Sequence, residues 1–198
     1  MTNTLINNHK KSLRTHYKRL RQGLSEEMQN QYSALICAKV LKMLPEKPIN
    51  IHLFLPMQGA GEVNLQLLLA TLWARGDRLY IPRIHGKSLE HIHFTKDTDL
   101  VLNRWQIPEP ALHHPPASID EISHIDWVLT PLLVCDEAGY RVGYGGGFYD
   151  QFFQEFPQVV KIGVGFFTPI ATISDRYQGD IPLDHYIMPG KKLTFEHR

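Results

Sequence analysis

The spacing of hydrophobic and polar positions predicts four helices. In the first, which spans residue 9 to about 22, apolar side chains recur every three or four residues: Leu13, Tyr17, Leu20 and Leu24. The second is expected to begin after Ser25, a capping hydroxyl followed by two acidic residues, and to end before Pro45. Two more are expected, at residues 64–75 with Asn64 as a candidate cap, and at residues 148–156.

Short apolar runs between these helices predict buried strands. They lie at residues 49–55, 78–84, 127–135 and 159–166, and residues 90–94 alternate like a half-exposed strand. The His- and Pro-rich residues 111–124 are expected to be a surface connection. Because strands alternate with helices, we expect an α/β fold of three layers, with helices flanking a mainly parallel sheet, in a single domain over residues 1–198.

Composition narrows the class of protein. The chain has 198 residues, 43% of them hydrophobic, but no apolar run long enough for a signal peptide or a membrane span. Its 21 Lys and Arg balance 20 Asp and Glu, so net charge favours neither nucleic acid nor membranes as partners. We expect a cytoplasmic monomer in which Cys37 and Cys135 are buried, reduced thiols.

The 11 histidines are interpreted as surface or loop residues rather than metal ligands. His91 and His93 have a spacing that could suit a metal, but strand alternation explains that spacing and no nearby residue completes a ligand set. His113 and His114 precede two prolines and are placed in a loop.

A glycine-rich stretch, Gly139 to Asp150, is the strongest candidate for chemistry. Glycines at 143, 145, 146 and 147 allow positive φ and close approach, so consecutive backbone N–H groups can converge on a phosphate, aided by the start of the following helix. Arg141 can add full positive charge, and Asp150 can hold a divalent cation. The spacing matches neither common nucleotide-binding fingerprint, however, and a structural turn would also use glycines.

A basic row lies next to the apolar face of the first helix. It contains Lys10, Arg14, Lys18 and Arg21, whereas Arg19 points away from it. Such a row suits the rim of a cleft. A solvated basic face, or an arm that touches RNA, would have the same pattern.

The segment R-V-G-Y-G-G-G-F-Y-D, residues 141–150, resembles the signature R-[LIV]-G-x-G-x-G-[FY]-Y-D of the 5-formyltetrahydrofolate cyclo-ligase family, also called 5,10-methenyltetrahydrofolate synthetases. The resemblance extends to K-K-S-L-R near the start, G-E-V-N, I-P-E-P and D-I-P-L-D, so it covers essentially the whole chain. It implies a fold related to those of sugar-phosphate isomerases and coenzyme A transferases.

The resemblance also implies a reaction and its co-substrates. The formyl oxygen of the reduced folate attacks the γ-phosphate of ATP, and N10 then closes the ring with loss of phosphate, which leaves 5,10-methenyltetrahydrofolate and ADP. Such a reaction needs stabilised anions, Mg²⁺ and in-line placement rather than a protein nucleophile.

By the same resemblance, specific residues acquire expected roles. ATP would be bound by Lys10, Arg14, Arg141, Gly143, Tyr144, Gly145, Gly146, Gly147, Phe148 and Tyr149. The folate would be bound by Met57, Glu62 and the loop residues Tyr144, Gly145, Gly146, Gly147 and Phe148. Arg141 and Tyr149 would be catalytic, and Asp150 and Asp180 would hold Mg²⁺. Glu62 could instead merely favour the start of the helix that follows it.

Four positions depart from the family pattern. Gln106 stands where glycine is usual, and Gln151 stands where an arginine often follows Y-D. In the tail, Pro169 replaces a usual glutamine, and Gly179 replaces the histidine or close substitute that usually precedes the magnesium-type aspartate. These departures leave open a regulator that binds reduced folate or nucleotide without turnover. The basic row leaves open an RNA-binding protein whose glycine loop is only structural.

Overall fold

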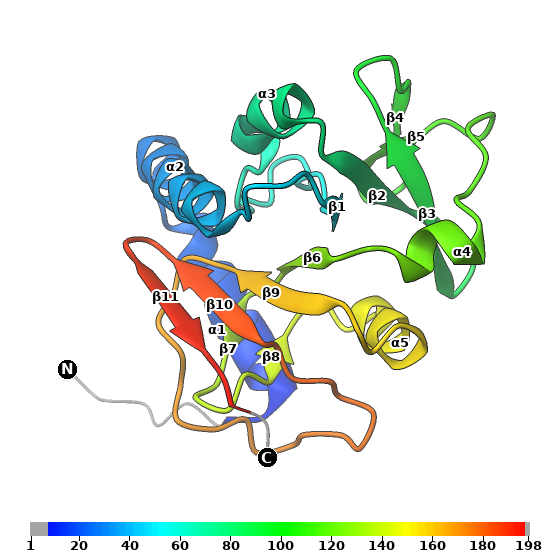
Figure 1. The fold of residues 1–198 in the computed structure, drawn as a ribbon. Coiled ribbons are helices and arrows are strands. Elements are labelled where there is room, and N and C mark those ends of the chain that lie inside the picture. The colour runs from blue at the N-terminus through cyan, green and yellow to red at the C-terminus, as the bar shows by residue number, and fades with distance from the viewer. Residues whose placement is uncertain (1–7, 197–198) are drawn as a thin grey trace.

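A mainly parallel sheet forms the centre of the molecule (Figure 1). The computed structural model describes residues 8–196. In this part of the chain, seven strands pair in the order β11-β10-β9-β6-β1-β2-β3, with both edge strands antiparallel to their neighbours. Their bounds are β1 Asn50–His52, β2 Arg78–His85, β3 Ser88–Phe94, β6 Trp127–Pro131, β9 Val160–Val164, β10 His185–Met188 and β11 Lys191–Thr194.

Helices cover both faces of this sheet, as the alternation of strands and helices predicts (Figure 1). Their bounds are α1 Lys10–Gln22, α2 Glu26–Met43, α3 Gln66–Arg75, α4 Ile119–Ser123 and α5 Phe148–Glu155. Of the two predicted caps, that of Ser25 is present: its Oγ accepts from Met28 N at 3.2 Å. The Asn64 prediction is wrong, because Leu65 is the residue at the N-cap of α3 and makes no side-chain capping bond. Asn64 lies one position earlier, where its Oδ1 accepts from Gln66 N at 3.0 Å.

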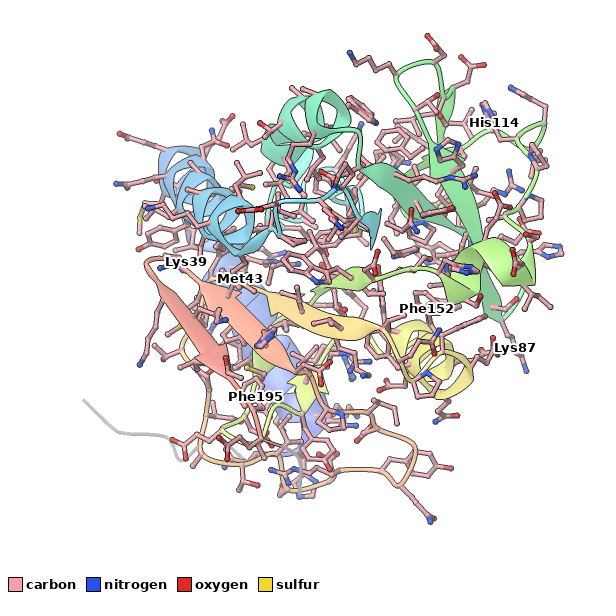
Figure 2. All side chains as sticks on the ribbon, viewed as in Figure 1. Lys39, Met43, Lys87, His114, Phe152 and Phe195 are labelled. Atoms are coloured by element: carbon pink, nitrogen blue, oxygen red, sulfur yellow. The ribbon has the colours of Figure 1, made fainter. Side chains whose placement is uncertain are left out.

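Strand alternation divides the hydrophobic core between the two faces. Leu129 of β6 packs in the cluster under α2 and α3, whereas its neighbour Val128 packs in the cluster with Phe152 of α5. Figure 2 labels Phe152 on α5. The expected α/β architecture is therefore confirmed.

Two short hairpins lie outside the main sheet. β4, Leu100–Leu102, pairs with β5, Pro108–Pro110, and this hairpin projects beyond β2 and β3 (Figure 1). β7, Val134–Cys135, pairs with β8, Arg141–Val142, just before the glycine-rich loop. The apolar run 127–135, predicted as one strand, thus divides between β6 and β7, because the chain leaves the sheet after Pro131 to form the second hairpin.

Several other expectations require correction. The strand expected at 49–55 is hydrogen-bonded as a strand only over residues 50–52. Residues 111–124 lie largely at the surface, as expected, but they contain the short helix α4. Arg21 is buried while Leu20 is 39% exposed, because Arg21 turns inward to ionic and polar partners described below. His52 and His91 are buried side by side, with ring centroids 5.0 Å apart, rather than lying in loops or at the surface.

Both cysteines are buried and free, as expected. None of the helices in residues 8–196 combines the length and the apolar character that crossing a membrane would require.

Candidate active site at the switch point of the sheet

A cavity of about 830 Å³ opens at the carboxyl ends of the parallel strands. The chain runs from β1 to β2 on one side and later returns to β6 on the other side of β1, which makes β1 and β6 the point where the strand order reverses. Loops diverge at such a point and leave a crevice. The cavity is lined there by Leu55 after β1, Pro82 in β2 and Pro131 at the end of β6. Its volume is within the ~300–1,000 Å³ usual for small-molecule sites.

The glycine-rich loop forms one wall of this cavity. Gly145 and Gly147 have φ values of +103° and +70°, which side chains rarely adopt. A Cβ on Gly145 would also stand 3.3 Å from Arg14 Nη2, whereas one on Gly143 would meet no protein atom within 4 Å. Within residues 8–196, the backbone N–H groups of residues 143–147 donate to no protein acceptor. The loop therefore presents unpaired donors beside the N-terminus of α5, as a phosphate site requires.

The basic row on α1 faces this loop. Arg14 Nε donates to Gly143 O at 2.9 Å, and Lys10 Nζ forms an ion pair with Asp180 Oδ2. Lys18 Nζ lies 4.9 Å from the centre of the Tyr144 ring. Lys10, Arg14 and Lys18 therefore line the cavity rather than forming a free solvated face.

Arg141 occupies the base of the loop and is only 7% exposed. Its Nη2 donates to Asp150 Oδ1 at 2.8 Å, and its Nη1 donates to Ile181 O at 2.6 Å. Burial lowers the pKa of Arg141 from its ordinary value, and the charges of Asp150 and Asp180 oppose that shift. A guanidinium keeps its charge in proteins, so Arg141 is a fixed cation at the cavity wall.

The two aspartates expected to bind a metal retain free ligand atoms. Asp150 uses Oδ1 for both Arg141 and Ile181 N, and Asp180 uses Oδ2 for both Lys10 and Tyr177 N. Among the described hydrogen bonds, the second oxygen of each carboxylate accepts none. Because Mg²⁺ typically takes one or two carboxylates together with phosphate oxygens and water, this donor set fits that ion.

Glu62 belongs to a buried charged cluster opposite the loop. Its Oε1 lies 3.9 Å from Arg21 Nη1, and both side chains are 6% exposed. Arg21 Nη2 donates to Tyr144 Oη, and Glu62 Oε2 accepts from Met57 N at 2.7 Å. Glu62 therefore orders its own loop and contacts Arg21, whereas α3 begins only at Gln66. These contacts exclude the alternative in which Glu62 only favours the start of the following helix.

Tyr144 and Tyr149 are neutral phenols at the cavity. Burial raises the pKa of both, and the charge of Glu62 adds to each shift. Tyr149 Oη is buried and has no hydrogen-bond partner among the described residues. An unpaired buried hydroxyl costs free energy unless a ligand or water satisfies it, so Tyr149 offers a donor to a bound molecule.

An apolar wall completes the cavity. It consists of residues from β2, β3 and the β4–β5 hairpin: Pro82, Ile84, Leu89, Trp105, Ile107 and Pro108. None of these residues was expected in the site, because isolated apolar residues in a sequence resemble core positions. The I-P-E-P motif is the signal that could have found three of them, because it contains Ile107 and Pro108 and begins two residues after Trp105.

Every site residue named from the sequence lines this cavity: Lys10, Arg14, Met57, Glu62, Arg141, Gly143, Tyr144, Gly145, Gly146, Gly147, Phe148, Tyr149, Asp150 and Asp180. They come from the first helix, the loop after β1, the glycine-rich loop and the segment before β10, so the fold brings distant segments together. Their individual functional roles stay predictions.

Comparisons with known proteins agree on one family. A family model described as "5-formyltetrahydrofolate cyclo-ligase family" matches residues 6–187. The 5-formyltetrahydrofolate cyclo-ligase of Escherichia coli strain K12 is 30% identical over 177 residues, which cover 86% of this chain and 95% of that protein. The mouse protein of the same name is 24% identical over 202 residues, covering 99% and 98%.

Solved structures show the same fold. The NMR structure of Aquifex aeolicus 5,10-methenyltetrahydrofolate synthetase superposes with a TM-score of 0.79 at 24% identity and covers 96% of this chain and 94% of that one. A 5,10-methenyltetrahydrofolate synthetase from Mycoplasma pneumoniae has a TM-score of 0.72 at 20% identity, covering 91% and 98%.

Proposed function

This chain belongs to the 5-formyltetrahydrofolate cyclo-ligase family, and we propose that it converts 5-formyltetrahydrofolate and ATP to 5,10-methenyltetrahydrofolate, ADP and phosphate in the cavity at the switch point. The observation that carries this proposal is the wall of unpaired backbone N–H groups at residues 143–147, with Arg14 and Arg141 beside it. Phosphoryl transfer depends mainly on positioning and on stabilised anions, which such a wall supplies.

Arg141 and the loop amides stabilise the charge on the transferred phosphate. Arg141 is held in place by Asp150 and Ile181 O before any ligand binds, so little reorganisation is needed during reaction. Lys10 and Arg14 approach the loop from α1 and bind the phosphates of ATP nearer the rim. The Tyr149 hydroxyl, which has no partner among the described residues, donates a hydrogen bond to an oxygen of the reacting groups.

Mg²⁺, when bound, neutralises phosphate oxygens and orients them for transfer. Asp150 and Asp180 are its proposed ligands, through the carboxylate oxygens that accept no protein hydrogen bond. Their partners Arg141 and Lys10 keep both side chains directed to the cavity.

The reduced folate lies between the glycine-rich loop and the apolar wall. Met57 and Glu62 contact it from the loop after β1, and the rings of Tyr144 and Phe148 provide flat faces for the pterin. The opposite surface, formed by Ile84, Trp105 and Ile107, is apolar and suits the other face of the flat pterin ring. We place the enzyme in the cytoplasm as a monomer, where the free buried thiols Cys37 and Cys135 stay reduced.

Purified protein mixed with ATP, Mg²⁺ and 5-formyltetrahydrofolate should produce the absorbance of the methenyl product. No product, with ATP and folate both bound, would instead support the non-turnover regulator. RNA binding that is strongly salt-dependent and lost in Lys10 and Arg14 variants would support the RNA-binding alternative.

Gly143→Ala tests the loop itself. A methyl group at this position meets no protein atom within 4 Å, and Gly143 lacks a positive φ, so the fold should be unaffected. If ATP phosphates lie against the loop, the methyl group intrudes on them and the KM for ATP should rise about 10-fold or more, equivalent to ~1.4 kcal/mol. An unchanged KM with an unchanged melting temperature would remove the loop from the ATP site.

A further inference from the structure

We propose a second metal site, separate from the cavity, in which Asp99, His113 and His114 bind a transition-metal dication such as Zn²⁺. One ligand atom from each of these residues lies within 4.8 Å of the other two. His113 Nε2 is 3.3 Å from Asp99 Oδ2, and the two imidazole rings have centroids 4.2 Å apart. Among residues 8–196, no other group of three such side chains meets this criterion.

The backbone around these ligands is already ordered. Arg83, which is 7% exposed, donates through Nη1 to Ala111 O at 2.8 Å and to His114 O at 3.1 Å. Ala111 N donates to Asp99 O at 2.9 Å, so the segment that bears the histidines is joined to the segment that bears the carboxylate. A preordered backbone reduces the conformational entropy lost when a metal binds.

The side chains can close the remaining gap. Zn–N bonds are ~2.0–2.1 Å long, so the donor atoms around a tetrahedral ion stand roughly 3.4 Å apart. The ligand atoms of Asp99, His113 and His114 lie within 4.8 Å of one another, so small side-chain rotations bring them to that spacing. His113 and Asp99 are 63% and 73% exposed and are free to rotate inward. His114 Nε2 accepts from Asp99 N at 3.1 Å, and a metal on that nitrogen takes over this lone pair.

The donor set selects the class of metal. Two imidazoles and one carboxylate suit Zn²⁺, Co²⁺, Ni²⁺ or Cu²⁺, whereas Mg²⁺ prefers oxygen ligands alone. Three protein ligands leave a coordination position for water, so the ion should exchange readily. The ion would not replace the Mg²⁺ proposed for Asp150 and Asp180.

The site lies at the base of the β4–β5 hairpin, and Figure 2 shows His114 beside this hairpin. Asp99 immediately precedes β4, and the histidines follow β5 by a few residues, so a bound ion would clamp the two ends of the hairpin together. The same hairpin contributes Trp105 and Ile107 to the apolar wall of the cavity. Metal binding therefore stabilises the segment on which one wall of the active site depends.

The test is a titration of the full chain, free of any affinity tag, with Co²⁺ followed by visible absorption, and with Zn²⁺ in competition. We expect one equivalent to produce ligand-field bands, Zn²⁺ to remove them, and saturating Zn²⁺ to raise the melting temperature. His113→Ala and Asp99→Asn should each weaken Co²⁺ binding at least about 10-fold. Loss of a residue that only hydrogen-bonds a metal ligand already costs ~10- to 100-fold, and these two residues are proposed as ligands themselves.

His124→Ala is the matched control. His124 is also an exposed histidine beside an aspartate, with its Nδ1 4.0 Å from Asp120 Oδ1, but it has no third ligand in the described structure. The His124→Ala variant should therefore bind Co²⁺ with the same affinity as the unmodified chain. Equal loss in His124→Ala and His113→Ala, or no stoichiometric Co²⁺ binding at all, would overturn the proposal.

Discussion

Gln106 adopts a left-handed backbone conformation, with φ of +61°, that glycine adopts at lower cost. The turn forms nevertheless, because Asn103 Oδ1 accepts from both Trp105 N and Ile107 N, at 2.8 and 3.1 Å. Gln106 O also accepts from Gln58 N at 3.0 Å and joins this turn to the loop after β1. The turn therefore forms with Gln106 in a backbone conformation that costs more free energy than it would for glycine.

Replacing Gln106 by Gly should raise the free energy of unfolding by up to about 1 kcal/mol, because relief of the left-handed strain exceeds the added freedom of the unfolded chain. Gln106→Val should lower it, since a β-branched residue tolerates positive φ least. Urea denaturation of the three proteins measures the order. A Val variant as stable as the Gly variant would contradict the conformation at residue 106.

Asp150→Asn tests the proposed magnesium ligand. The amide keeps the shape of the side chain but removes the negative charge that Mg²⁺ needs, so the Mg²⁺ concentration for half-maximal turnover should rise about 10-fold or more. Asp120→Asn, at an exposed position, is the control and should leave the titration unchanged. A titration for Asp150→Asn that overlays that of the unmodified protein would exclude Asp150 as a ligand.

Among the elements, those whose apolar residues recur with clear helix or strand periodicity could be predicted from the sequence. α1, α2, α3 and α5 all lie close to their expected bounds. β11 was missed because its residues Lys191–Thr194 are largely exposed and polar, as an edge strand requires, and therefore show no apolar run. β10 was missed because the sequence around it resembles a tail, although Tyr186 and Ile187 are fully buried.

The contact between α1 and the glycine-rich loop carries a prediction at this scale. Arg14→Met removes the guanidinium that donates to Gly143 O and, in our proposal, binds phosphate. Loss of a charged hydrogen bond of ~1.5–3 kcal/mol should raise the KM for ATP about 10- to 100-fold. The KM for 5-formyltetrahydrofolate should change less.

Arg19→Met is the control for this experiment, because Arg19 lies on the same helix but is exposed and does not line the cavity. Steady-state kinetics with each substrate varied in turn separates the two effects. Equal changes in both KM values for Arg14→Met would indicate a general distortion of the loop instead of lost phosphate binding.

At the scale of the whole molecule, the candidate site is predictable where a local motif marks it and not where only the tertiary fold creates it. The loop at residues 143–147 was found because several glycines in a short segment are a local signal. The apolar wall, in contrast, combines Pro82, Leu89 and Trp105, which become neighbours only when β2, β3 and the β4–β5 hairpin assemble. The same holds for Asp99 with His113 and His114, whose proximity depends on the pairing of β4 with β5.

The buried histidines His52 and His91 link the fold of the whole molecule to pH. They pack with Phe152 beneath α5, and His52 Nδ1, His52 Nε2 and His91 Nδ1 have no hydrogen-bond partner among the described residues. Burial lowers the pKa of His91 from 6.5 to about 4. Burial also lowers the pKa of His52 well below its usual value, and the charge of His91 adds to that effect. Both histidines are therefore neutral in the folded protein at neutral pH.

Acid should begin to destabilise the protein at a pH above the range in which carboxylates titrate. Below pH 6.5 the unfolded chain takes up protons on these histidines while the folded chain does not, so the free energy of unfolding falls as pH falls from 6.5 toward about 4. Each histidine contributes up to about 1.4 kcal/mol per pH unit in that range. His91→Gln should therefore flatten the decline between pH 6.5 and 5, whereas His85→Gln, at a side chain 78% exposed, should not. Urea denaturation at several pH values measures both slopes, and a slope for His91→Gln equal to that of the unmodified protein would show that the acid sensitivity arises elsewhere.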